Sequence, residues 1–113
     1  MPQPNTFFKM TESNGTTACV VLIRPADKID AVTPLDFKTN AAGDYVASQP
    51  LSSGRYFIEW VMLSNPGGTI AIDIADGAGK PVRPSIKDTN ETGKAFKWNA
   101  NEFTIAAAGA KTP

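Results

Sequence analysis

The sequence predicts an all-β fold: a single-domain antiparallel β-sandwich of immunoglobulin-like or jelly-roll type, with seven to nine short strands. Nine Gly and nine Pro divide the 113 residues into short runs rich in Val, Ile, Thr and aromatic residues, a spacing typical of strands and turns. No stretch has clear helical periodicity. A chain of this length fits one domain, residues 1–113.

The expected strands follow one another in chain order, and turn residues separate them. Pro81 and Pro84 cannot donate to a β-ladder, so the run between them should be an edge strand or an irregular crossing. The segment Asn65-Pro66-Gly67-Gly68 predicts a tight turn, because proline presets φ at the second position and glycine accepts a positive φ at the third. We place the strands at residues 5–10, 16–24, 32–37, 44–47, 54–63, 69–75, 82–86, 94–98 and 102–107.

Charge and composition exclude several classes of function. The chain has 11 Lys and Arg against 11 Asp and Glu, a formal net charge of zero, so binding to nucleic acid or to an anionic membrane is not expected. Histidine is absent, which removes imidazole bases, imidazole metal ligands and Ser/His or Cys/His nucleophile pairs. We therefore expect neither an enzyme nor a cofactor.

The single cysteine, Cys19, and the start of the chain bear on its location. Cys19 lies in the apolar run 18–23, where a buried, unreactive thiol is expected, and one cysteine cannot form an intramolecular disulfide. The first ten residues lack a basic segment followed by an apolar stretch, and no run reaches transmembrane length. The sequence thus predicts a soluble, cytoplasmic protein.

The strongest local signal is the pair of runs 54–63 and 69–75, joined by the loop 64–68. A hairpin symmetric about Pro66 would place Trp60 opposite Ile72, with two further apolar pairs beside them. Alternation would then put all these side chains on one face, the expected core face. A slip of one residue would separate Trp60 from the isoleucines, so the pattern favours this register.

The opposite face of the same hairpin is the candidate binding surface. Phe57, Val61 and Leu63 would point outward there, although they are too apolar for a fully solvated surface. The run 18–23 is apolar on both faces too, and as a neighbouring strand it would enlarge the patch. Either a second copy of the chain or the N-terminal segment with Phe7 and Phe8 could cover it.

In this register Glu59 lies opposite Asp73, and like charges facing each other across a strand pair are destabilising. Arg24 or Arg55 could compensate for the repulsion, and so could a bound cation with oxygen ligands. Two nearby carboxyl groups also resemble the geometry of a retaining glycosidase, but a flat strand pair offers no cleft. The candidate site residues are thus Phe57, Glu59, Val61, Leu63 and Asp73.

Three functions follow from these features. The first is a non-catalytic interaction or assembly module that binds a protein partner or itself through the outward apolar face. The second is a carbohydrate-binding, lectin-like module using Phe57, Glu59 and Asp73 as a ring-plus-carboxylate platform. The third is a small carboxylate-dependent hydrolase, which has the least support. The other aromatic pair, Phe96 and Trp98, shares one face of its run and is expected to pack in the core.

Overall fold

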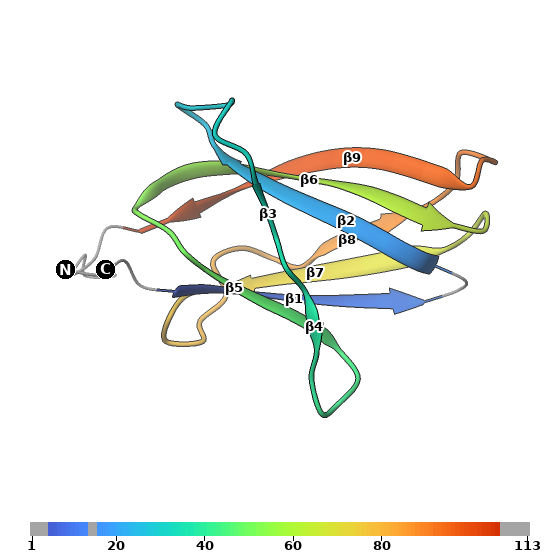
Figure 1. Ribbon diagram of the computed structural model, residues 1–113, viewed down its shortest axis with the longest axis horizontal. Helices are drawn as coiled ribbons and strands as arrows, with labels where there is room; N and C mark the ends of the chain where they lie inside the picture. The colour runs from blue at the N-terminus through green and yellow to red at the C-terminus, as the bar shows by residue number, and fades with distance from the viewer. Residues whose placement is uncertain (1–4, 14–15, 107–113) are drawn as a thin grey trace.

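The computed structural model describes residues 5–13 and 16–106. In this part of the chain two antiparallel sheets pack face to face, which confirms the predicted β-sandwich (Figure 1). No helix of the described residues is long and apolar enough to cross a membrane. The strands are β1 (Asn5–Ser13), β2 (Thr16–Pro25), β3 (Thr33–Pro34), β4 (Lys38–Thr39), β5 (Tyr45–Pro50), β6 (Gly54–Ser64), β7 (Thr69–Ala75), β8 (Ile86–Thr89) and β9 (Phe96–Ile105).

The two sheets divide the strands unevenly. Sheet A has the order β4-β5-β1-β7-β8, and sheet B has the order β3-β2-β6-β9. In Figure 1 the long strands β2, β6 and β9 form the upper layer, and β1, β5 and β7 form the lower layer. The edges of sheet B are therefore the very short β3 and the long β9.

Most predicted strands are present, with three differences. The run 32–37 contains only the two-residue β3, and β4 was not predicted. Most of the runs 94–98 and 102–107 belongs to one strand, β9, which covers only Phe96–Ile105, and Ala107 lies outside the described residues. Pairing with β6 continues through residues 99–101, which separate the two predicted runs. Only the end of the run 82–86 belongs to a strand, because β8 begins at Ile86 and Pro81 contributes an isolated bridge to Ala75.

The predicted pairing of the runs 54–63 and 69–75 is wrong. β6 pairs with β2 and β9, whereas β7 pairs with β1 and β8, so the two runs belong to different sheets. The connecting turn crosses between the sheets: Gly67 N donates to Asn90 O and Asn90 N donates to Gly68 O, both at 2.8 Å. Gly67 does have the expected positive φ, 87°.

The residues assigned to the core face are nevertheless all buried. Trp60 and Ile72 are at most 2% exposed, but they point inward from opposite sheets instead of facing each other along one ladder. Further along the core, the Phe103 ring stacks on Tyr56 at 5.3 Å and meets the edge of Phe8 at 5.8 Å. Each large apolar side chain removed from water contributes about 1.5–3 kcal/mol. The core cluster also includes Met10, Val21, Ile23, Ile58, Met62, Ile70 and Ile74.

A buried carboxylate joins the two sheets where β8 lies near β9. Asp88, on β8, accepts hydrogen bonds from Trp60 Nε1 at 2.8 Å and from Lys97 Nζ at 2.6 Å. Asn99 Nδ2 adds a longer contact of 3.4 Å. Because all three donors belong to sheet B, this network links the edges of the sandwich with polar contacts instead of apolar packing.

Candidate functional site: the outer face of sheet B

The outer face of sheet B collects four of the five predicted site residues. On β6 the side chains of Phe57, Glu59, Val61 and Leu63 alternate with fully buried ones and point away from the core. β2 lies on one side of β6 and β9 on the other, so each outward residue belongs to a row across three strands. The rows are Ala18–Leu63–Phe96, Val20–Val61–Trp98, Leu22–Glu59–Ala100 and Arg24–Phe57–Glu102.

One end of this face is apolar and open to solvent. The fractional exposures are 60% for Trp98, 56% for Val20, 52% for Phe96 and 44% for Leu63. Val61 lies between them in the register and is half-buried. We call these five residues the apolar cluster.

The expectation that Phe96 and Trp98 pack in the core is wrong. Phe103 and Ile105 point inward, and alternation along one continuous strand then turns Phe96 and Trp98 outward. The inward positions at this end of β9 hold Lys97 and Asn99, which reach Asp88. The sequence shows that Phe103 and Ile105 share one face of a strand. This alternation predicts the direction of Phe96 and Trp98 only if all four residues belong to the same strand, and the prediction placed them in two.

Charged groups occupy the rest of the face. Arg24 pairs with Glu59, and Trp98 Nε1 donates to Glu59 Oε2 at 3.2 Å. The Arg55 guanidinium lies 5.5 Å from the centre of the Phe57 ring, within cation–π range. The apolar cluster therefore borders a region of ion pairs, Arg24 with Glu59 and Arg55 with Glu102.

The fifth predicted residue, Asp73, does not belong to this site. It lies on β7 in sheet A, where its Cα partner in β1 is Lys9 and not Glu59. The prediction that Glu59 faces Asp73 is thus wrong. The geometric basis for a shared cation or a two-carboxylate hydrolase is removed with it. Among the described residues no three His, Cys, Asp or Glu side chains are grouped to hold a metal ion.

The outer edge of β9 is partly occupied by local hydrogen bonds. Because Ser64 N donates to Ala95 O, the register turns the backbone groups of residues 96, 98, 100 and 102 away from β6. Thr92 Oγ1 donates to Phe96 O at 3.2 Å and Arg83 Nη1 to Glu102 O at 2.7 Å. The amides of Ala100 and Glu102 donate to the neighbouring Asn99 and Asn101 side chains. Such contacts oppose addition of another strand at this edge.

The N-terminal strand does not cover the apolar cluster. Phe8 is buried in the core and Phe7 lies on the outer face of sheet A, both on β1. Cys19, on the inward side of β2, is also unsuited to surface chemistry. Burial, together with the charges of Glu12 and Asp88, raises the pKa of its thiol to about 12, so the reactive thiolate is scarce at neutral pH.

Comparisons with models of protein families, with curated proteins and with solved structures find no match. A β-sandwich supports many unrelated activities, so the fold alone selects none of them. The function has to be inferred from the residues of the site.

Proposed function

We propose that this protein is a non-catalytic interaction module that self-associates by stacking the outer face of sheet B on the same face of a second copy. The observation that carries the proposal is the solvent exposure of the apolar cluster across three adjacent strands. Burial of apolar surface is favourable by about 25 cal/mol per Å². Contiguous apolar patches on soluble proteins commonly mark such contacts.

The order of residues in the rows supports a second copy as the partner. A two-fold axis parallel to β6, between two stacked copies, places β9 of one copy over β2 of the other. In the row Val20–Val61–Trp98, Trp98 then packs on Val20 of the second copy. In the row Arg24–Phe57–Glu102, the same operation brings Arg24 against Glu102. Under this operation apolar residues meet apolar residues, and Arg24 meets the oppositely charged Glu102.

The size of the face sets the expected strength of association. Three strands about 4.8 Å apart and about ten residues long cover roughly 500 Å² on each copy. Two copies would bury roughly 1,000 Å², near the lower limit for a specific interface. We therefore expect a weak, reversible dimer. A cytoplasmic location remains a prediction, and the protonated thiol of Cys19 is compatible with it.

Sedimentation equilibrium of the full chain over a range of concentrations tests this function. We expect the wild-type protein to shift from monomer to dimer as its concentration rises. Trp98→Ala should weaken the dimer by at least about tenfold, because a central tryptophan commonly contributes 2 kcal/mol or more. Phe7→Ala is the matched control, because it removes a ring of 44% exposure from the outer face of sheet A.

Two results would contradict the proposal. One is a wild-type protein that stays monomeric up to about 0.5 mM, beyond the range expected for an interface of this size. The other is a dimer that Phe7→Ala weakens as much as Trp98→Ala does. Denaturant unfolding of both variants separates a lost contact from a lost fold.

A further inference from the structure

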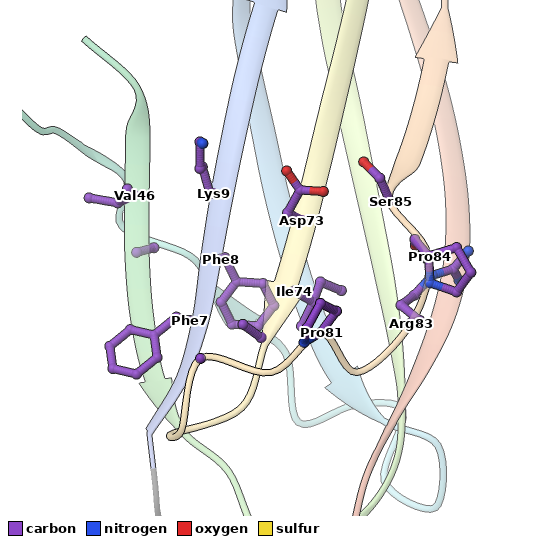
Figure 2. A pocket seen from close by; sticks show the side chains of 13 residues that line it. Phe7, Phe8, Lys9, Val46, Asp73, Ile74, Pro81, Arg83, Pro84 and Ser85 are labelled. Carbon is purple, nitrogen blue, oxygen red and sulfur yellow. Dashed lines mark hydrogen bonds between the residues drawn. The ribbon is translucent and has the colours of Figure 1, made fainter. Parts of the chain in front are cut away.

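A cavity of about 520 Å³ opens on the outer side of sheet A, on the far side of the sandwich from the apolar cluster. Residues of β1, β5 and β7 form its floor, and the segment 79–85 forms one wall. Figure 2 shows the side chains of Phe7, Pro81 and Pro84 around it, together with those of Lys9, Asp73 and Ser85. Its volume lies in the range of small-molecule sites.

The cavity exists because the ladder between β7 and β8 stops early. Ile72 pairs with Ile86, but the preceding residues leave the sheet, and contact with β7 resumes only where Val82 N donates to Ile74 O at 2.9 Å. The turn before this segment is held by Asp76, whose Oδ1 accepts from Ala78 N and Lys80 N, both at 2.9 Å. These hydrogen bonds hold the segment 79–85 in place, so the cavity is formed without a bound ligand.

The lining is divided into an apolar part and a polar row. The Phe7 ring and the two prolines supply the apolar part. Lys9, Asp73 and Ser85 supply the polar row: Lys9 and Asp73 are Cα partners on β1 and β7, and Figure 2 shows Ser85 beyond Asp73. This row contains an ammonium donor, a carboxylate acceptor and a hydroxyl that can do both.

The charges around the cavity balance when Asp44, which pairs with Lys9 but does not line the cavity, is counted with Lys9, Arg83 and Asp73. Lys9 and Asp73 carry opposite charges side by side, and Lys9 Nζ also lies 3.6 Å from Asp44. The Arg83 guanidinium is held by Asn101 Oδ1 and by the carbonyls of Pro84 and Glu102. A charged ligand would be attracted by either Lys9 or Asp73 and repelled by the other. Neutral hydroxyls, in contrast, can accept a hydrogen bond from the Lys9 ammonium and donate one to the Asp73 carboxylate.

We propose that this cavity binds a neutral pyranose sugar. Its apolar C–H face would lie against the Phe7 ring and the prolines, and its hydroxyls would bond to Lys9, Asp73 and Ser85. The sequence analysis predicted a carbohydrate site formed by Phe57, Glu59 and Asp73. The proposed site keeps Asp73, but its aromatic ring is Phe7 instead of Phe57. This binding does not depend on self-association through sheet B.

Amide NMR titration of the full-length protein with methyl β-D-glucopyranoside, methyl β-D-galactopyranoside and methyl α-D-mannopyranoside tests the proposal. We expect at least one glycoside to shift the amide signals of Phe7, Lys9, Asp73 and Ser85 saturably, with a dissociation constant in the millimolar range. The indole signal of Trp98 should stay unchanged. Phe7→Ala and Asp73→Asn should each weaken binding at least about tenfold.

The matched controls lie on sheet B. Phe96→Ala removes an equally exposed ring and Glu102→Gln neutralises an exposed carboxylate, and both should leave glycoside binding unchanged. Should Phe7→Ala fail to fold, Phe7→Leu keeps the apolar bulk without the flat ring and should weaken binding in the same way.

Three results would overturn the proposal. The first is no saturable shift with any of the three glycosides. The second is a shift centred on Trp98 and Glu59 instead of the cavity. The third is that free leucine, a zwitterion with an apolar side chain, shifts the cavity amides while the glycosides do not.

Discussion

The outer faces of the two sheets follow the same alternation but have different compositions. On sheet A, Phe7 of β1 is followed outward by Lys9 and Thr11, with Asp73 beside them on β7. On sheet B the outward rows at one end contain only apolar side chains. Strand geometry therefore decides which residues point outward, whereas side-chain chemistry decides whether that face suits water. Sheet A provides an internal control for every surface change made on sheet B.

The largest expected effect comes from breaking the link that holds both faces in place. Asp88→Ala should lower the free energy of unfolding by about 3 kcal/mol, because Lys97 and Trp60 Nε1 lose a buried partner. Denaturant unfolding followed by tryptophan fluorescence measures this. As a control, the exposed Asp30→Ala should change the free energy of unfolding by no more than about 0.5 kcal/mol. An equally small effect of Asp88→Ala would show that the Asp88 network does not stabilise the fold.

A charge exchange on sheet B should have an intermediate effect and tests the proposed two-fold arrangement. Arg24→Glu alone and Glu102→Arg alone should each weaken the homodimer about tenfold, because the two Arg24–Glu102 pairs of the dimer become repulsive. Arg24 also pairs with Glu59 in its own chain, so denaturant unfolding checks that each variant still folds. Mixing the two variants should restore association, since each repulsive pair becomes attractive in the heterodimer.

Sedimentation equilibrium of each variant and of their mixture provides the measurement. Lys9→Glu on sheet A is the control and should leave the dimer unchanged. A mixture that associates no better than either variant alone would exclude the two-fold arrangement that places β9 of one copy over β2 of the other.

The smallest effect is the acid dependence contributed by Asp88. Burial raises the pKa of this carboxyl group, but hydrogen bonds from Lys97 and Trp60 and the charge of Lys97 outweigh it, so the folded-state pKa is lowered. The resulting stabilisation is complete above the unfolded pKa of about 3.9 and is lost as pH falls through the folded value. Asp88→Asn should therefore flatten the loss of stability below about pH 4, as measured by urea unfolding at several pH values. An unchanged acid dependence would show that other carboxylates cause it.

Several features could be predicted because they depend on local chemistry. Alternation along 54–63 identified the buried set of β6 and the outward set with Phe57, Val61 and Leu63. The turn chemistry assigned the positive φ of Gly67. Each of these inferences uses only neighbours in sequence or the period of a strand.

By itself, the sequence determined where strands form and which side chains turn inward, since a two-residue period and turn residues are local properties. Only the tertiary structure decided which strands pair, because backbone ladders have nearly the same hydrogen bonds whatever their sequences. Trp60 and Ile72 satisfy the same burial by meeting across the sandwich as they would along a hairpin. That choice separated Glu59 from Asp73, brought β9 beside β6, and exposed Trp98 on the face with the predicted residues.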